Sequence, residues 1–397
     1  MKNRNLQILS FTLVVVMLGF GIIIPILPFY VERYGGGGVA MGSLMSAFSV
    51  AQFIFSPIWG SLSDRYGRKP ILMVGMLGNA LSHVLFALST ELWMLTVSRA
   101  LGGILSSATL PTAMAFISDS TSEKERGGGM GVVGAAFGVG MVLGPGIGGM
   151  MAGMSLQAPF YLAAGLSMVS LFLVWILLPE SLPAQQRASV SVQIQGPKLG
   201  EMLRALSGPI GFLLILAFLH NFALTNFEGI YSFYAQKRYG YDEKTVGLIL
   251  TVVGLVSAIA QGVLTGIFSK RFGDSLVIKV SLLASIFGFA LMILPESLPM
   301  VLTAAGFFVL TNAMLRPGVA SLISKKTDIG QGAAMGLNNS FMSLGRIVGP
   351  LWAGTVLDIN LNYPFLTGAA IMLVAYLASL KFLPTEVVEN VQPASAD

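Results

Sequence analysis

The sequence predicts an all-α polytopic membrane protein with twelve transmembrane helices, arranged as two pseudo-symmetric bundles of six. Composition is the first reason, because 54% of the 397 residues are hydrophobic and only 10% are charged, whereas soluble domains carry roughly 25% charged residues. The second is that twelve segments have the ~20 mostly apolar residues that a spanning helix needs. The third is that motifs of the first half recur in the second half.

The predicted spans form two groups of six, separated by the longest polar break in the chain. The first apolar run is too long for a signal-peptide core, so we expect it to remain as the first spanning helix. The predicted domains are an N-terminal bundle at 1–179, a cytoplasmic linker at 180–208 and a C-terminal bundle at 209–397. The predicted spans are 6–29, 41–62, 70–89, 93–117, 127–151, 158–179, 209–235, 244–268, 275–295, 299–323, 331–356 and 363–383.

The two halves repeat each other with an offset close to 205 residues. The stretch GPGIGG at 144–149 recurs as GPLWAG at 349–354, and GSLSDRYG at 60–67 recurs as GIFSKRFG at 266–273. Each unit holds an even number of spans, so both units enter the membrane from the same side. This is a parallel repeat about an axis along the membrane normal, which is typical of a transporter with two halves.

The distribution of Lys and Arg predicts the orientation of the chain. With the N-terminus inside, the inner loops hold sixteen of these residues and the outer loops hold four. Positive charge accumulates on the cytoplasmic side, so both termini are predicted to be cytoplasmic. This placement accounts for the net charge of +5 without nucleic acid. The chain has no cysteine, which excludes disulfides and thiolate nucleophiles.

An acidic residue, Glu228, lies inside the seventh predicted span. On a continuous helix it shares a face with Asn221, Thr225, Tyr231 and Ser232, and such a polar stripe is expected to face a cavity. An ionised acid at mid-bilayer costs about 2.5–3.5 kcal/mol. Glu228 is therefore predicted to exchange a proton for a cationic substrate. The alternative is a structural acid that is paired with an internal arginine.

Three arginines lie inside predicted spans: Arg99, Arg316 and Arg346. Arg346 shares a helix face with Asn339 and Ser343, and an arginine in the cavity would weaken selection for cations. The two histidines, His83 and His220, lie in different halves and do not suggest a metal site. The predicted substrate cavity comprises Asn221, Thr225, Tyr231, Ser232, Asn312, Arg316, Asn339, Ser343 and Arg346.

Two further motifs are predicted to form contacts between helices, one at a cytoplasmic gate and one along the fifth helix. GSLSDRYGRKP at 60–70 is predicted to form a cytoplasmic gate that holds helix ends together across the two halves, with a plain positive anchor as the alternative. Asp119 is expected to pair with Arg68 or Lys69 in this gate. GPGIGG indicates a kinked, tightly packed helix, with an ordinary packing seam as the alternative. The residues concerned are Gly60, Asp64, Arg65, Gly67, Arg68, Lys69 and Asp119 in the gate, and Gly140, Gly144, Pro145, Gly148 and Gly149 in the fifth helix.

These motifs resemble a known family. The loop at 60–69 resembles the signature G-x-L-x-D-R-x-G-R-K of the major facilitator superfamily, and LTVSRALGG around Arg99 resembles its fourth-helix arginine motif. GMVLGPGIGG at 140–149 resembles the fifth-helix motif of proton-coupled drug exporters. FEGIYSFY at 227–234 and GLNNSFMSLGRIVGP at 336–350 resemble twelve-helix bacterial pumps of the quinolone and multidrug type. The tetracycline exporters are more distant.

The resemblance implies the major facilitator fold, a location in a bacterial cytoplasmic membrane, a role for Arg99 in proton coupling, and a place for Asp119 in the gate network. The sequence departs from this family at three positions. Related pumps often carry acids at the positions of Ala313 and His83, and they tend to carry a neutral polar residue at the position of Arg346. These departures bear on the substrate range.

The predicted function is proton-coupled efflux of lipophilic, mainly cationic drugs by alternating access. Export of a specific metabolite or sugar-like compound, and translocation of a lipid or glycolipid, remain as alternatives. The sequence shows no catalytic constellation, so an enzyme is not predicted. Neither a metal nor a cofactor is expected beyond the proton motive force. The expected partners are small lipophilic molecules, protons and membrane lipids, and the protein is expected to be a monomer.

Overall fold

The computed structural model describes residues 3–121, 123–183, 187 and 199–383. The described residues of this chain form helices and no strands. Most of the predicted linker lies outside the described residues. The N-terminal helices are α1 (Asn3–Arg33), α2 (Gly38–Tyr66), α3 (Arg68–Ala87), α4 (Leu92–Ser106), α5 (Thr109–Ser120), α6 (Glu123–Ala152) and α7 (Ala158–Leu177).

The remaining elements follow the linker. They are α9 (Leu199–Ala205), α10 (Gly211–Glu228), α11 (Tyr231–Tyr239), α12 (Glu243–Ile259), the π-helical segment η1 (Ala260–Leu264), α13 (Thr265–Phe272), α14 (Asp274–Leu291), α15 (Leu298–Ala313), α16 (Leu315–Lys326), α17 (Gln331–Ile359) and α18 (Tyr363–Phe382).

All twelve predicted spans are helical, and the fold is that of a polytopic membrane protein. Within the described ranges, eleven helical segments are long and apolar enough to cross a membrane. The segment predicted at 331–356 is α17, which is long enough but is not one of these eleven. Polar side chains such as Asn338, Ser343 and Arg346 make this helix less apolar than its neighbours.

Three predicted spans are each divided into two helices, which corrects the expectation of continuous helices there. Span 93–117 is interrupted between α4 and α5, and span 299–323 between α15 and α16. In both cases the second helix has a proline in its first turn, Pro111 or Pro317, which lacks the amide needed to continue the preceding helix. Span 209–235 is interrupted after Glu228, at a glycine and an isoleucine.

The repeat has a counterpart in the backbone. The loop after α1 contains Gly35 with φ +73°, and the loop after α11 contains Gly240 with φ +68°. Gly67, after α2, has φ +103°, and Gly273, after α13, has φ +79°. Positive φ values favour glycine because it has no Cβ. The two halves therefore turn at matching positions, 205 and 206 residues apart.

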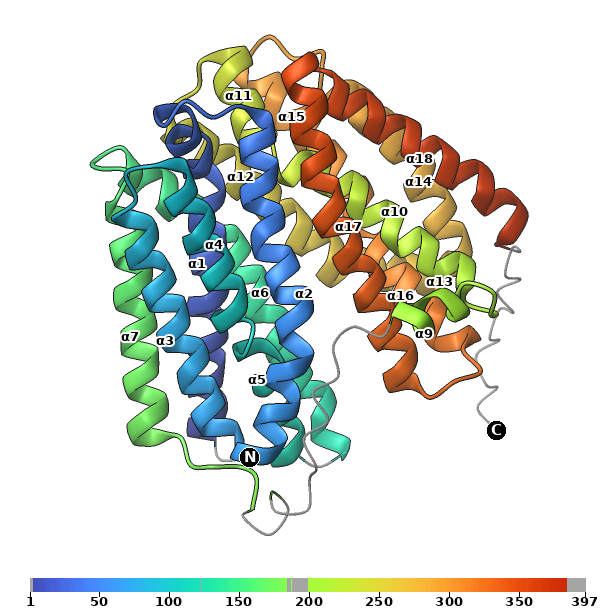
Figure 1. Ribbon diagram of the computed structural model, residues 1–397. Helices are drawn as coiled ribbons and strands as arrows, with labels where there is room; N and C mark the ends of the chain where they lie inside the picture. Colours follow the sequence, from blue (N-terminus) through green and yellow to red (C-terminus); the bar gives the residue numbers. More distant parts are fainter. Residues whose placement is uncertain (1–2, 122, 184–186, 188–198, 384–397) are drawn as a thin grey trace, which may run out of the picture.

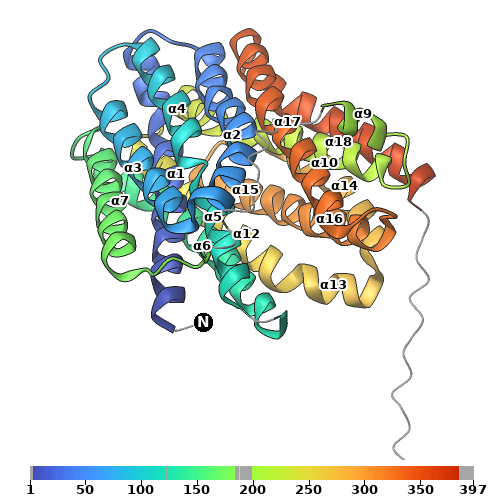
Figure 2. The same cartoon turned by 60° about the horizontal axis from the view of Figure 1, so that its bottom comes forward.

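The helices form two groups, α1–α7 and α10–α18, which lie side by side in Figure 1. Between the groups, α2 packs against α17 and α6 packs against α12. We call the end where α1 begins the termini end, and the end that carries α11 the opposite end. The ribbons of the two groups meet toward the opposite end and diverge toward the termini end (Figure 1, Figure 2).

Buried aromatic side chains fill the interior of each group. In the second group, Phe308 lies between Phe227 and Phe289, with ring centroids 4.7 Å and 4.6 Å away. In the first group, Phe86 stacks on Phe160 at 4.5 Å. Phe227 lies one residue before Glu228, so its contact with Phe308 is close to the interruption between α10 and α11.

Candidate functional site

The helix α6 packs tightly on two sides through its glycines. One side faces α1, where a Cβ built on Gly144 would lie 2.8 Å from the Cα of Gly21, and a Cβ on Gly148 would lie 2.7 Å from the carbonyl oxygen of Ile22. Gly140 approaches Met17 in the same way. Small residues permit this close approach in membranes. The predicted tight packing of this helix is therefore present.

The other side of α6 faces α12 of the second group. A Cβ on Gly247 would lie 2.6 Å from the carbonyl oxygen of Pro145 and 3.0 Å from the Cα of Gly149. Two helical turns further along α12, a Cβ on Gly254 would lie 2.6 Å from the carbonyl oxygen of Met141. The glycine-proline motif thus belongs to an interface between the two groups and not only to a packing seam within one of them.

A second interface joins α2 to α17. Glycines again bring the backbones together, since a Cβ on Gly42 would overlap the carbonyl oxygen of Pro350. Ser46 donates a hydrogen bond to the carbonyl of Ile347 at 2.6 Å. At the opposite end, the Asp358 carboxylate accepts hydrogen bonds from the amides of Gly38 (2.6 Å) and Val39 (2.9 Å) at the start of α2. An anion at a helix N-terminus is favourable.

One more contact joins the groups at the opposite end. The Glu32 carboxylate, at the end of α1, accepts hydrogen bonds from Gln236 and Lys237 on α11. Together with the Asp358 contact, it ties the two groups together at the opposite end in this conformation.

The predicted proton-coupling residue, Glu228, is the last residue of α10 and is half-buried. Arg316 on α16 is exposed and Arg346 on α17 is half-buried. Both guanidinium charges act on the carboxylate. Among the described residues, no cation lies within 4.0 Å of Glu228 to form an ion pair. The Glu228 carboxylate therefore experiences the charges of Arg316 and Arg346 but forms an ion pair with neither of them.

Part of the predicted polar stripe around Glu228 is buried in this conformation. Asn221 and Thr225 are each only 6% exposed, and they face α17, where a Cβ on Gly345 would lie 2.8 Å from the Cβ of Asn221. The Thr225 hydroxyl donates to the carbonyl of Asn221 at 2.9 Å. These two residues thus lie in the contact between α10 and α17 in this conformation, and their place in the substrate cavity remains a prediction.

The interruption after Glu228 separates the other stripe residues from it. Tyr231 and Ser232 belong to α11 and are each 1% exposed, and the Tyr231 ring stacks on Phe227 with centroids 4.6 Å apart. Asn312, which is also buried, donates to the carbonyl of Phe308 at 2.9 Å. These three residues lie in the interior of the second group in this conformation, and their assignment to the cavity remains a prediction.

The predicted stripe on α17 is accessible. Asn339 is exposed, and Ser343 and Arg346 are half-buried. Arg346 donates a hydrogen bond to the Ser343 hydroxyl at 3.1 Å, which holds its guanidinium. The face formed by these three residues lies next to the glycine face that packs against α10. A role in substrate binding remains a prediction for this face.

Arg99 is buried in the first group, away from the Glu228 cluster. Its guanidinium lies 4.4 Å from the centroid of the Phe48 ring, and Nη2 lies 3.9 Å from the sulfur of Met45. Cation–π contacts of this kind stabilise a desolvated arginine. In the part of the chain that the structure describes, Arg99 has no ion-pair partner, and its charge acts on His83. A role in proton coupling remains a prediction.

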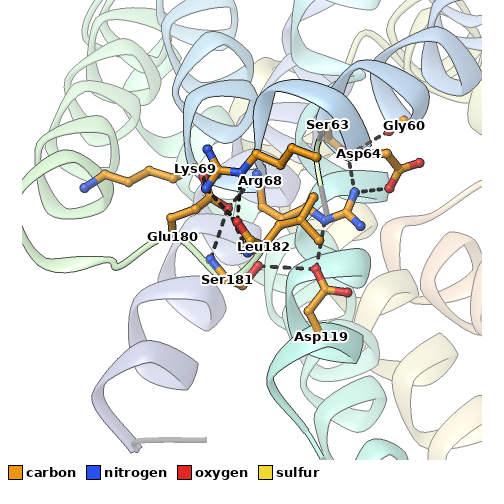
Figure 3. A network of polar contacts seen from close by, with 10 residues as sticks. Gly60, Ser63, Asp64, Arg68, Lys69, Asp119, Glu180, Ser181 and Leu182 are labelled. Carbon is orange, nitrogen blue, oxygen red and sulfur yellow. Dashed lines mark hydrogen bonds and ion pairs between the residues drawn. The ribbon is translucent and has the colours of Figure 1, made fainter. Parts of the chain in front are cut away.

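The signature loop forms a polar network around Arg68, at the start of α3 (Figure 3). Its guanidinium pairs with Asp64 at 2.5 Å and with Asp119 at 2.9 Å, and it donates to the Ser63 hydroxyl at 2.7 Å. The Arg68–Asp119 pair was one of the two pairings that the sequence suggested, and it is confirmed. The arginine itself is buried, so its charge depends on these partners.

Sequence reasoning missed Glu180, which follows α7. Its carboxylate accepts hydrogen bonds from the backbone amides of Arg68 (2.8 Å) and Lys69 (3.2 Å) and so caps the N-terminus of α3 (Figure 3). A side chain at Gly67 would overlap Glu180. Ser181 adds a hydrogen bond to Asp119 at 3.3 Å. The acid is visible in the sequence, but the helix that it caps lies more than a hundred residues away.

The predicted gate across the halves is not formed in this conformation. The described partners of Arg68 and Lys69 come from the first group and the residues just after it. Arg65 is exposed and lies over the Tyr66 ring at 5.6 Å, and Gly60 has open space around it. The reason is geometric, because the two groups diverge at this end of the molecule (Figure 1).

The second half contains the same network with the charges reversed. Asp274 at the start of α14 is buried and accepts from Lys325 and Ser321, both at 2.6 Å. These positions lie 206 residues after Arg68 and Asp119. Each half therefore joins the start of its third span to the end of its fourth by an ion pair of opposite polarity.

We expect Arg68→Gln to destabilise the protein. The change leaves the partly exposed carboxylates of Asp64 and Asp119 without their guanidinium partner, and loss of one partner of a buried hydrogen bond costs about 1–3 kcal/mol. The apparent unfolding temperature in detergent is expected to fall by several degrees. Arg65→Gln, the same change at an exposed neighbour, is the matched control and should leave it unchanged. Equal unfolding temperatures for the two variants would contradict the structural role given to Arg68.

Comparison with known proteins places the chain in a family. The family model of the Major Facilitator Superfamily matches residues 9–242 and 213–397. Multidrug resistance protein 1 of Bacillus subtilis (strain 168) is 33% identical over 92% of this chain and 92% of its own length. The quinolone resistance protein NorA of Staphylococcus aureus (strain MRSA252) is 29% identical over 91% of this chain and 92% of its own length.

The fold is found in solved structures too. The human organic anion transporter MFSD10 has a TM-score of 0.70 and 25% identity, over 95% of this chain and 99% of that one. The superfamily model covers both helix groups, and the interfaces of α2 with α17 and of α6 with α12 join those groups in a pseudo-symmetric way. The chain belongs to the Major Facilitator Superfamily, as a multi-pass membrane protein.

Proposed function

We propose that this protein exports lipophilic, mainly cationic drugs in exchange for protons. The observation that carries the proposal is the carboxylate of Glu228, which is half-buried within a spanning segment and has no ion-pair partner in the described part of the chain. An intramembrane acid is expensive and marks an ion or substrate pathway. The names of the two bacterial relatives, one for multidrug and one for quinolone resistance, support the same conclusion.

In the proposed mechanism, Glu228 alternates between a proton and a cationic substrate. The termini end faces the cytoplasm, where the groups diverge, and a substrate enters there. Protons enter from the outside after the contacts of Asp358 and Glu32 at the opposite end have separated. The protein acts as a monomer and uses the proton motive force, without a cofactor.

The energy available is sufficient for useful export. Exchange of one proton for one monovalent cation moves no net charge, so the pH difference across the membrane drives it. One pH unit corresponds to about 1.4 kcal/mol for each proton, which supports about a tenfold substrate gradient. The interfaces rich in glycine allow the helices of the two groups to rock against each other without side chains in the way.

Everted membrane vesicles test this proposal. A respiratory substrate energises the vesicles, and ethidium is added to the exposed cytoplasmic face. Vesicles that contain the protein should accumulate ethidium, and a protonophore should release it. Unchanged accumulation for ethidium and for several other cationic dyes, relative to vesicles without the protein, would count against drug export. A headgroup-quenching assay in the same vesicles detects the alternative activity, lipid translocation.

A further inference from the structure

A carboxylate at the opposite end joins the two groups through the backbone of α2. Asp358 lies in the last turn of α17, and its oxygens accept separate hydrogen bonds. Oδ1 accepts from the Gly38 amide at 2.6 Å, and Oδ2 accepts from the Val39 amide at 2.9 Å. A Cβ on Gly37 or on Gly38 would lie 2.9 Å from Oδ1. The carboxylate therefore fits closely against the start of α2.

This contact requires the ionised form of Asp358. A carboxylate accepts hydrogen bonds with both oxygens, whereas a protonated carboxyl group carries a hydrogen on one of them. Because each oxygen of Asp358 already has its own amide donor, a proton on either oxygen displaces one of the two hydrogen bonds. The proton also removes the negative charge that is favourable at the N-terminus of α2. Protonation of Asp358 thus weakens the contact between the two groups.

The position of Asp358 on its own helix adds to this effect. Helix α17 ends at Ile359, so the carboxylate lies near the unpaired carbonyls of the last turn, where a negative charge is unfavourable. The N-terminus of α2 offsets this as long as the two groups are in contact. Once α2 moves away, the ionised form loses that compensation. Separation of the groups and protonation of Asp358 therefore favour each other.

Solvent reaches this carboxylate at the opposite end. Asp358 is exposed and lines a cavity of about 440 Å³ between α11, α17 and the loop before α2. Lys237 is the other charged residue of this lining, and its ammonium donates a hydrogen bond to Glu32 at the end of α1. The hydroxyl of Tyr34, in the same loop, donates to the carbonyl of Ser89. The first turn of α2 carries no charged side chain. Among the described residues, Asp358 is thus the one acid that lines the cavity.

We propose that Asp358 senses protons at the opposite end and controls its opening. The ionised side chain holds α2 against α17 and keeps this end closed, and a proton from the outside releases α2. The inference rests on the proposed export function, in which this end faces the outside, and it adds a second acid to the cycle beside Glu228. Acid outside therefore opens this end first, and a proton then reaches Glu228.

The distance between two spin labels tests this inference. Because the chain has no cysteine, Thr90→Cys and Met300→Cys place one label on each group. Thr90 lies in the loop after α3, Met300 lies in the first turn of α15, and both are exposed at the opposite end. Pulsed electron paramagnetic resonance on the full chain in lipid nanodiscs measures the ratio of separated to closed molecules at pH 8 and at pH 4.5.

For the wild type, the lower pH should raise this ratio about fivefold, which is a usual effect of losing a side chain that caps a helix. Asp358→Asn resembles the protonated acid, because its amide nitrogen presents a donor to one of the two backbone amides. This variant should raise the ratio by a similar factor already at pH 8 and should respond little to pH. A purely structural role of Asp358 would shift the ratio and leave the pH response intact.

Three other changes of a carboxylate to an amide are controls. Glu296→Gln alters an exposed loop acid at the same end and should behave as the wild type. Glu32→Gln removes the other carboxylate contact of this end, and Glu228→Gln removes the acid of the seventh span. Both should keep the pH response, since Asp358 remains. Each variant should elute as a monodisperse protein in detergent, which shows that it is folded.

The outcomes separate this inference from the proposed function. The sensing role of Asp358 is refuted if the wild type does not respond to pH, if Asp358→Asn responds as the wild type does, or if Glu228→Gln abolishes the response. Ethidium accumulation in everted vesicles is measured independently, and drug export stands or falls with that assay. A pH response that depends on Asp358, in a protein that does not accumulate any dye, would support the sensor and refute the export of drugs.

Discussion

Replacement of Glu228 by glutamine is expected to abolish proton-coupled export. The substitution keeps the size and polarity of the side chain but removes the group that takes up and releases the proton. Addition of drug to energised everted vesicles should cause proton release with the wild type and none above background with Glu228→Gln. We expect at least a hundredfold loss of accumulation against a gradient, because the step that couples the proton to the cargo is absent.

Two measurements separate loss of coupling from loss of fold. Glu296→Gln, the same change at an exposed loop carboxylate, should leave accumulation unchanged. Glu228→Gln should elute as a monodisperse protein in detergent, and it should still exchange labelled for unlabelled dye across the membrane at equilibrium. Full accumulation by Glu228→Gln would refute the assigned role.

The second large loss of transport is expected from the substitution Gly42→Val. Backbone carbonyl oxygens cannot move aside as a flexible side chain does, and a Cβ at Gly42 overlaps the oxygen of Pro350. The valine should therefore keep α2 away from α17 and prevent the two groups from closing at the opposite end. Accumulation is expected to fall to a few per cent of the wild type, while the protein still inserts in the membrane.

Because the chain has no cysteine, a single introduced thiol can report on this closure. Ser46→Cys lies in the α2–α17 interface, where the native side chain is 3% exposed. A membrane-impermeant maleimide should label this cysteine slowly in the native background and at least tenfold faster with Gly42→Val. Gly165→Val on α7, where a Cβ has open space, is the matched control and should behave as the native background. Slow labelling together with full transport by Gly42→Val would contradict the proposed closure.

The amino-acid sequence by itself determined the number and positions of the spanning helices and the duplication of the six-helix unit. The positions of the twelve spans follow from runs of apolar residues, since a helix crossing the membrane must satisfy its backbone internally and present apolar side chains to lipid. The duplicated unit was visible in recurring motifs, and the glycines at Gly67 and Gly273 confirm matching turns. The pair of Arg68 with Asp119 could be suggested because both residues lie at the same predicted membrane surface.

The tertiary structure alone decided which polar groups meet and which are covered. The stripe through Asn221 and Tyr231 was drawn on a continuous helix, but Asn221 packs against Gly345 of α17, and Tyr231, which follows the interruption, stacks on Phe227. Glu180 caps a helix distant in sequence. Hydrophobic periodicity reports the preference of each residue for lipid or water, whereas burial and pairing depend on the neighbours that packing brings together.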